Sequence, residues 1–190
     1  MNRDRYLLVI SGPSGSGKDS VVAKLMGLHP GIECSVSATT RPPREDEMEG
    51  VHYFFLTREA FRQKIAQGDL IEYTEYVGNY YGTLKSQVDI RLDKKITCVL
   101  VIEVEGAANI KQFYPDCTTV FILPPSIEEL ERRLRKRGTE DEEWVHKRMM
   151  RAEEEMALAN QYDYTLVNDD LDRCAADLFE ILKQRQDDKE

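Results

Sequence analysis

Residues 10–20 read Ile10-Ser11-Gly12-Pro13-Ser14-Gly15-Ser16-Gly17-Lys18-Asp19-Ser20, a glycine-rich stretch between two apolar segments. The apolar run at residues 6–10 predicts a buried parallel strand, and apolar residues recur with helical spacing over residues 21–28. A strand, a glycine-rich turn and a helix in this order are the context of a phosphate-binding P-loop. The glycines let backbone N–H groups approach an anion closely, while Lys18 and the positive end of the helix dipole attract it. We therefore expect this whole stretch, through Ser20, to bind the phosphates of a nucleotide.

One position departs from the P-loop pattern, which places Ser or Thr after the lysine as a ligand of Mg²⁺. Asp19 stands there instead, and Ser20, the next residue of the helix, points about 100° away from that position. Aspartate is a good oxygen ligand for Mg²⁺, so Asp19 is our candidate metal-binding residue. The helix dipole alone also favours an acid in the first turn of a helix, and the sequence leaves both explanations open.

The composition is that of a globular protein. A chain of 190 residues with 41% hydrophobic and 32% charged residues suits one sizeable domain. The net charge of −9 argues against a general nucleic-acid or membrane-surface binder, and no apolar run approaches the roughly 20 residues of a membrane helix. The four widely spaced cysteines form no metal-binding pattern, and no signal peptide is visible. These features predict a cytoplasmic protein, and they indicate no particular oligomeric state.

Strands and helices alternate along most of the chain. We expect strands at residues 6–10, 32–37, 96–104, 118–123 and 164–167, and helices at residues 21–28, 86–92, 107–113, 126–136, 139–160 and 171–184. This alternation predicts an α/β fold with a doubly wound parallel sheet. Ser126 with Glu129, and Thr139 with Glu142, have the spacing of capping boxes at two helix starts.

The middle of the chain interrupts this alternation with a small, mostly β insertion at residues 34–83. It contains a helix that Thr57 is expected to cap. A β-rich run at residues 70–76 leads to Gly78-Asn79, which predicts a two-residue hairpin turn that returns through residues 80–83. The chain is then a single domain over residues 1–190, with a core of residues 1–33, 84–136 and 160–190, the insertion, and a lid of residues 137–159.

A second candidate anion site lies in the insertion. Arg41 and Arg44 flank two prolines, which stiffen the backbone and fix the two guanidinium groups on a rigid segment. Tyr53 and Tyr81 can add phenolic donors, so that two guanidinium groups and two hydroxyls converge on one phosphate. Taken singly, each of these residues is better explained as a solvated arginine or a core tyrosine. Together they favour a site.

A group of basic residues follows in the second half of the chain. Its members are Arg132, Arg133, Arg135, Lys136, Arg137, Lys147, Arg148 and Arg151. A solvated helix face explains most runs of this kind, and about half of these residues are expected to be surface charge. Arg137-Gly138-Thr139, however, lies at a break between two helices, where a mobile lid would hinge, and phosphoryl transfer calls for arginines.

The chain resembles guanylate kinases in five segments that follow the family's order. They are Gly12-Pro13-Ser14-Gly15-Ser16-Gly17-Lys18, Ser35-Val36-Ser37-Ala38-Thr39-Thr40-Arg41-Pro42-Pro43-Arg44, Gly78-Asn79-Tyr80-Tyr81-Gly82-Thr83, Arg137-Gly138-Thr139 and Val167-Asn168-Asp169-Asp170. The resemblance extends from about residue 6 to the last helix. It implies a P-loop nucleoside monophosphate kinase fold with a GMP-binding insertion and a helical lid. It also implies phosphoryl transfer from ATP to GMP with Mg²⁺, in purine nucleotide metabolism, with ATP and GMP as small-molecule substrates.

The resemblance further implies a role for individual residues. Lys18, Arg133, Arg137 and Arg148 would be catalytic, and residues 12–20 with Asn168 would bind ATP. The GMP-binding residues would be Ser37, Arg41, Arg44, Tyr53, Glu72, Tyr81, Thr83 and Glu103. Of these, Glu72 would read guanine, and Thr83 would contact the guanine carbonyl. Glu103 matches an acidic residue at the end of the family's central strand that faces both nucleotides.

A second magnesium-related position departs from the family, because its other strand carboxylate falls on Val101. With Asp19, this leaves metal binding open. Two alternative functions remain at this point. One is a non-catalytic guanylate-kinase-like module that binds phosphorylated peptides, and the other is a P-loop kinase for another small acceptor.

Overall fold

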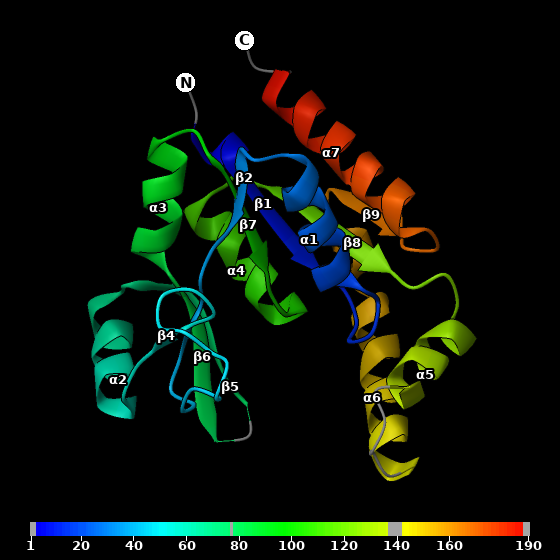
Figure 1. Ribbon diagram of the computed structural model, residues 1–190, viewed down its shortest axis with the longest axis horizontal. Coiled ribbons are helices and arrows are strands. Elements are labelled where there is room, and N and C mark those ends of the chain that lie inside the picture. The colour runs from blue at the N-terminus through cyan, green and yellow to red at the C-terminus, as the bar shows by residue number, and fades with distance from the viewer. Residues whose placement is uncertain (1–2, 77, 137–141, 188–190) are drawn as a thin grey trace.

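The computed structural model describes residues 3–76, 78–136 and 142–187. The predictions made for Arg137, Gly138 and Thr139 therefore lie outside the described residues. Two sheets organise the described chain, one of five strands and one of four (Figure 1).

The five-stranded sheet is parallel throughout and has the order β2-β7-β1-β8-β9. Its strands are β1 (Leu7–Ser11), β2 (Ile32–Cys34), β7 (Thr97–Val101), β8 (Thr118–Leu123) and β9 (Tyr164–Val167). All residues of β1 are buried, as expected for the central strand of a sheet that is covered on both faces. The predicted doubly wound α/β fold is thus confirmed.

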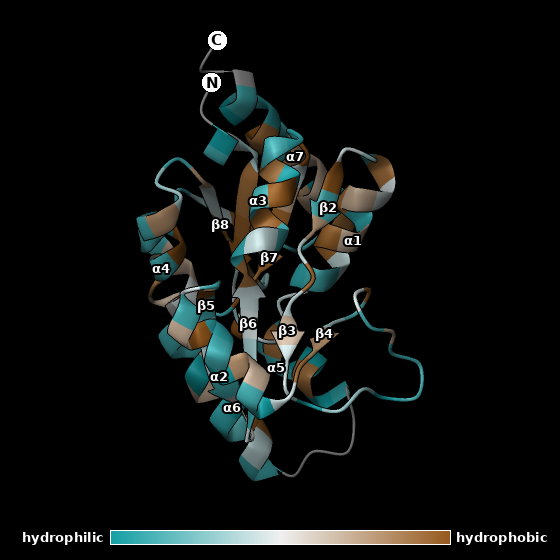
Figure 2. Cartoon of the chain, turned by 90° about the vertical axis from the view of Figure 1, so that its left-hand side faces the viewer, coloured by the Kyte–Doolittle hydropathy of each residue, from teal (hydrophilic) through white to brown (hydrophobic). Residues whose placement is uncertain are grey.

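Helices cover both faces of this sheet. On one face α1 (Lys18–Leu28) and α7 (Leu171–Asp187) pack against Leu8 and Ile10. On the other face α3 (Lys85–Asp93) and α4 (Val104–Phe113) pack against Leu7 and Val9. Successive residues of β1 therefore enter two separate cores, which is the alternation that a strand imposes. Figure 2 shows the hydrophobic residues on the central strands and hydrophilic residues over the outer surfaces of the helices.

The four-stranded sheet has the order β4-β3-β6-β5 and carries α2 (Arg58–Gln67). Its strands are β3 (Ala38–Thr39), β4 (Phe54–Phe55), β5 (Leu70–Tyr76) and β6 (Asn79–Leu84). The hydroxyl of Thr57 accepts a hydrogen bond from the backbone N–H of Ala60 at 3.1 Å, which confirms the predicted cap. Asn79 pairs with Tyr76 inside the hairpin, so the prediction that Gly78-Asn79 forms the two-residue turn is wrong by one position. Gly78 has the positive φ, +71°, that such a turn requires.

Two strand predictions are too long. β2 ends at Cys34, because the chain then leaves the edge of the parallel sheet and enters the second sheet at Ala38. β7 ends at Val101, and Val104 begins α4 with Glu103 as its N-cap residue. The apolar run simply continues into the buried side of α4, and an apolar run alone does not distinguish a strand from a helix.

Two further helices, α5 (Ile127–Lys136) and α6 (Glu142–Met156), project from the same end of the parallel sheet as the second sheet, on the opposite side (Figure 1). The hydroxyl of Ser126 caps α5 by accepting from the Glu129 N–H at 3.1 Å, while the Glu129 carboxylate pairs with two arginines instead of closing the box. The predicted helix to residue 160 is wrong at its end. After Met156 the chain tightens into a 3₁₀ turn, Ala159–Gln161, and a second such turn, Arg3–Tyr6, precedes β1.

In the part of the chain that the structure describes, no helix has both the length and the apolar composition needed to cross a membrane.

Candidate active site

The glycine-rich loop joins the end of β1 to the start of α1, as the sequence predicts. Gly12, Gly15 and Gly17 have φ values of +147°, +93° and +91°, which side-chain-bearing residues rarely adopt. At Gly12 a Cβ would also lie 2.2 Å from the carbonyl oxygen of Ile122 in β8, so the loop is seated directly against the sheet. The ammonium group of Lys18 donates to the backbone carbonyl of Gly12 at 2.5 Å, which holds the lysine over the loop.

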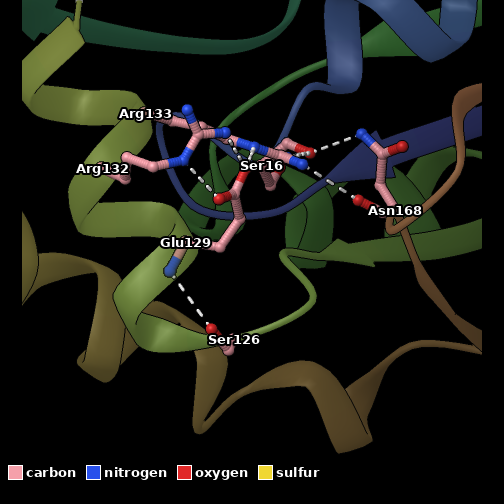
Figure 3. A network of polar contacts seen from close by, with 6 residues as sticks. All are labelled: Ser16, Ser126, Glu129, Arg132, Arg133 and Asn168. Atoms are coloured by element: carbon pink, nitrogen blue, oxygen red, sulfur yellow. Dashed lines mark hydrogen bonds and ion pairs between the residues drawn. The ribbon is translucent and has the colours of Figure 1, made fainter.

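A polar network ties this loop to α5 and to the segment after β9 (Figure 3). The side-chain amide of Asn168 donates to the carbonyl of Ser16 at 2.7 Å. Arg133 donates to the same carbonyl and to the Asn168 carbonyl, each at 3.3 Å, while its Nε donates to Glu129 at 2.8 Å. A Cβ on Gly17 would lie 2.3 Å from the Asn168 amide nitrogen. Two predicted site residues, Arg133 and Asn168, therefore meet at the loop.

The helix α6 reaches the loop through another predicted arginine. Arg148 donates to the hydroxyl of Ser14 at 2.5 Å, and its guanidinium lies 5.7 Å from the ring centroid of Trp144. One turn further along α6, Arg151 donates to Glu103 at 3.3 Å. One arginine of α5, Arg133, and one of α6, Arg148, thus contact the loop and place positive charge beside it, as an anion site requires.

The second predicted anion site is partly assembled in the structure. The guanidinium of Arg41 lies 5.6 Å from the ring centroid of Tyr53, and the rings of Tyr53 and Tyr81 meet edge to face at 6.1 Å. Arg41 also donates to the carboxylate of Glu47 at 2.7 Å. Arg44 is exposed, and among the described residues its guanidinium has no hydrogen-bond partner; only its backbone N–H donates to Glu47. The structure thus brings three of the four predicted residues together.

Glu72 and Thr83 form a cross-strand pair between β5 and β6. The Thr83 hydroxyl donates to Oε1 of Glu72 at 2.7 Å, and Thr83 is 1% exposed. Burial raises the pKa of the Glu72 carboxyl above its ordinary value, while the hydrogen bonds from Thr83 oppose that shift. A half-buried carboxylate beside a buried hydroxyl can recognise a ligand that offers both donors and an acceptor.

A cavity of about 170 Å³ joins the loop to the second sheet. Its lining includes Asp19 at the start of α1, Ser37, Tyr53 and Thr83 from the insertion, and Val101 at the end of β7. Asp19 is exposed, and among the described residues its carboxylate has no hydrogen bond or ion pair. Asp19 and Val101, the two positions that depart from the magnesium pattern, thus line one cavity. A larger cavity of about 540 Å³ lies alongside and shares Cys34, Ser35 and His52 with it.

The described residues contain no group of three or more His, Cys, Asp or Glu side chains that could hold a metal ion. A cage made of protein ligands alone is therefore not part of the described chain. Mg²⁺ in phosphoryl-transfer sites is usually held by one or two carboxylates together with substrate phosphates and water. The exposed carboxylate of Asp19, which pairs with none of the described residues and lies beside the phosphate loop, fits that requirement.

Sequence reasoning missed two acidic residues of the site. Glu47 holds Arg41, and this pairing lowers the pKa of Glu47 to about 2, so the pair stays ionised throughout the physiological range. Glu155 of α6 accepts from Arg151 at 2.8 Å with only 12% of its side chain exposed. Burial raises the pKa of Glu155, with Glu103 nearby as a further cause. The four-residue spacing of Arg151 and Glu155 was the one signal that could have indicated this pair.

A P-loop at the end of the central strand of a parallel α/β sheet defines the class of P-loop nucleotide-binding proteins. Within this class, the sequence profile of the guanylate kinase family matches residues 4–185. The chain belongs to the guanylate kinase family.

Individual relatives agree with the family profile. A guanylate kinase of Prochlorococcus marinus (strain MIT 9312) is 43% identical over 183 residues, which are 96% of this chain and 100% of the relative. A guanylate kinase of Alkalilimnicola ehrlichii (strain ATCC BAA-1101 / DSM 17681 / MLHE-1) is 48% identical over 175 residues, 92% of this chain and 86% of the relative. The crystal structure of guanylate kinase from Anaplasma phagocytophilum matches with a TM-score of 0.75 and 35% identity, covering 95% of this chain and 86% of that chain.

Proposed function

We propose that this chain transfers the γ-phosphoryl group of ATP to GMP, forming ADP and GDP, within purine nucleotide metabolism. The observation that carries the proposal is the similarity to guanylate kinases over nearly the whole chain, at 43% and 48% identity. The family is one of kinases, so the chain is a phosphotransferase. Residues 34–83 would be the GMP-binding insertion, residues 137–159 the lid, and the remaining residues the core.

The P-loop would bind ATP, the phosphoryl donor. Residues 12–20 would bind the ATP phosphates through backbone N–H groups, and Asn168 would lie near adenine. The contacts of Lys18 with loop carbonyls support this role, because the ammonium group already lies where phosphates would enter. Arg133, Arg137 and Arg148 would neutralise the charge of the transferring phosphoryl group, and the contacts of Arg133 and Arg148 with the loop support that role.

The acceptor side belongs to the second sheet. Arg41, Arg44, Tyr53 and Tyr81 would hold the phosphate of GMP, with Ser37 and Glu103 close by. The Glu72 carboxylate would accept from N1–H and from the 2-amino group of guanine. The Thr83 hydroxyl has one proton, which it donates to Glu72 in this structure, and it would turn to donate that proton to O6 when guanine binds. Adenine offers a lone pair at N1 and an amine in place of O6, so the same two side chains would be left unpaired.

The reaction itself needs no strong general base. A phosphate oxygen of GMP is the nucleophile and is ionised near neutral pH, so the protein has to align two anions and neutralise their repulsion. Lys18 of the P-loop, Arg133 of α5 and the arginines of the lid and the insertion would supply that neutralisation. Closure over the substrates would also exclude water, which otherwise competes as an acceptor.

Mg²⁺ is the cofactor that we propose, with Asp19 as its protein ligand. The exposure of the Asp19 carboxylate and its place in the cavity beside Val101 support this assignment. Bound Mg²⁺ would neutralise charge on the ATP phosphates.

The experiment that tests the function measures ADP release from ATP with GMP, AMP, CMP or no acceptor. We expect release with GMP to exceed release with AMP by about 10⁴-fold or more, since the polar groups of the base site would be left unpaired by adenine. Preference for another nucleotide would identify a P-loop kinase for a different acceptor. No release with any nucleotide would point to a non-catalytic module, for which binding of a phosphorylated peptide is the direct assay.

A further inference from the structure

The strand that carries Glu72, β5, contains an irregularity where it packs against the core of the protein. Between Leu70 and Glu72 the pairing of β5 with β6 shifts register, which makes Ile71 the extra residue of a β-bulge. Ile71 is 4% exposed and packs in the same core cluster as Ala107 and Ile110 of α4. Bulges redirect side chains next to functional sites. Here the bulge lies where β5 packs against α4, a helix that covers one face of the parallel sheet.

Glu72 lies against the same helix at Gly106. A Cβ placed on Gly106 would lie 3.1 Å from Oε2 of Glu72, 3.4 Å from its Cγ and 3.5 Å from its Cδ. The first of these distances is shorter than an ordinary van der Waals contact, so a side chain at this position would displace the carboxylate. On its other side the carboxylate accepts the Thr83 hydroxyl bond at 2.7 Å. Glu72 is therefore held between a hydroxyl and a bare stretch of helix backbone.

Backbone geometry does not explain the glycine at this position. Gly106 lies inside α4 and is not among the described glycines with a positive φ. Glycine is less favourable than alanine in a helix, so this position carries a cost in stability. The contact with Glu72 accounts for that cost, because glycine lets the carboxylate lie closer to the helix than a Cβ, which would be 3.1 Å from Oε2, would allow without a shift.

We propose that Gly106 is a positioning residue for recognition of the acceptor base. By lacking a side chain, it lets the Glu72 carboxylate keep the orientation in which both oxygens can accept from a base that carries two adjacent N–H groups. The inference rests on the proposed function, since guanine is the base that offers these donors. It adds a residue on the core side of the molecule to a base site otherwise built on the second sheet.

The decisive variant is Gly106→Ala, compared with Gly27→Ala as a matched control. Gly27 also lies in a helix, α1, but a Cβ there would meet nothing within 4 Å. We expect Gly106→Ala to raise the KM for GMP about tenfold, because a displacement of about 1 Å can cost about 10²-fold and this one is smaller. The KM for ATP should stay unchanged, and Gly27→Ala should change neither constant. A KM for GMP within twofold of the wild-type value would overturn the proposal.

A thermal unfolding cycle tests the contact independently of catalysis. Gly106→Ala is introduced into the wild-type chain and into a Glu72→Ala chain, in which the obstructing carboxylate is absent. We expect the substitution to raise Tm in the Glu72→Ala chain, through helix propensity, and to raise it less or lower it in the wild-type chain. Equal shifts in both chains would show that Gly106 does not contact Glu72 and would overturn the proposal, even if Gly106→Ala folds poorly.

The proposed function and the role of Gly106 would be overturned by different results. A wild-type protein that does not phosphorylate GMP would overturn the proposed function and the role of Gly106 with it. A wild-type protein that phosphorylates GMP, together with an unchanged Gly106→Ala variant, would overturn the role of Gly106 alone.

Discussion

The two anion sites of this chain are held in place by different physical means. The P-loop is shaped by steric fit, since Gly12 lies against the Ile122 carbonyl of β8 and leaves no room for a Cβ. The loop that carries Arg41 lies beside strands of only two residues and is held by charge, through the Arg41–Glu47 pair. One site is part of the folded core, and the other is a largely exposed segment in which the Arg41–Glu47 ion pair and hydrogen bonds within the loop hold the backbone.

Because of this difference, substitutions at the two sites should affect stability and substrate binding differently. A change in the P-loop acts on the core of the parallel sheet, so it should affect folding and catalysis together. A change in the Arg41 loop acts on an exposed segment, so it should affect the acceptor alone. The acceptor site nevertheless has one core element, the Glu72–Thr83 pair next to α4, where binding and stability should oppose each other.

The largest effect that we expect comes from Gly12→Ala. The new Cβ would lie 2.2 Å from a backbone oxygen at a φ of +147°, so both steric overlap and backbone strain oppose it. We expect the free energy of unfolding to fall by about 4 kcal/mol. Gly31→Ala, where a Cβ would meet nothing within 4 Å, is the control and should stay within about 0.5 kcal/mol of the wild type. Urea denaturation measures both, and similar values for the two variants would contradict the steric account of the loop.

Local chemistry explains which parts of the fold were predictable from the sequence. The strand–glycine–helix order predicted the P-loop, and the hydroxyl of Thr57 at a helix start predicted a cap that the structure contains. Strands with turn residues on both sides, such as residues 70–76 and 118–123, were predicted with their correct ends. The end of β7 was missed because the apolar residues Ile102 and Val104 on either side of Glu103 extend the β-rich pattern, and only tertiary packing makes Val104 the start of a helix.

The candidate site was predictable only where one motif carried it. Glu47 could not be identified among three neighbouring acids, because its pairing with Arg41 depends on how the loop folds back. The bulge at Ile71 has no sequence signal of its own, since one extra residue in a β-rich run leaves the composition unchanged. The contact of Gly106 with Glu72 joins residues of two elements far apart in sequence, and only the packing of β5 on α4 brings them together.

Arg41→Lys tests the charge-held site. Lysine keeps the positive charge but loses the planar fork that donates to Glu47 and stacks on Tyr53. We expect the KM for GMP to rise about tenfold, equivalent to about 1.4 kcal/mol, with the KM for ATP and the unfolding free energy unchanged. Arg62→Lys, an exposed arginine of α2 in the same insertion, is the control. A rise in the KM for ATP would mean that this loop serves the donor instead.

Asp19 and Val101 line one cavity at the boundary of the two sites, so they should act as a pair. We predict that the metal-binding carboxylate has moved from the strand position to the loop position. Asp19→Ser and Val101→Asp should each lower kcat, and the double variant should recover it, with a coupling of about 1 kcal/mol, or roughly fivefold. The measurement is kcat against Mg²⁺ concentration. Additive effects, or an unaltered Mg²⁺ dependence in Asp19→Ser, would refute the exchange.

The smallest effect that we expect concerns Glu72, a residue whose proposed role in binding the base opposes the stability of the fold. Burial raises the pKa of the Glu72 carboxyl in the folded chain, so the folded state holds this proton more tightly than the unfolded state. The stability that the protonated form provides is present below the unfolded pKa, about 4.3, and is lost as the pH rises through the higher folded value. Glu72→Gln removes the ionisation and can still accept the Thr83 hydroxyl bond.

Glu72→Gln should therefore be more stable than the wild type at pH 7 to 8, and this advantage should shrink as the pH falls toward about 4.3. Urea denaturation at a series of pH values measures the difference. Glu75→Gln is the control, because Glu75 lies on the same strand with 47% of its side chain exposed. A Glu72→Gln advantage that does not change with pH would show that packing, and not the cost of a buried charge, accounts for it.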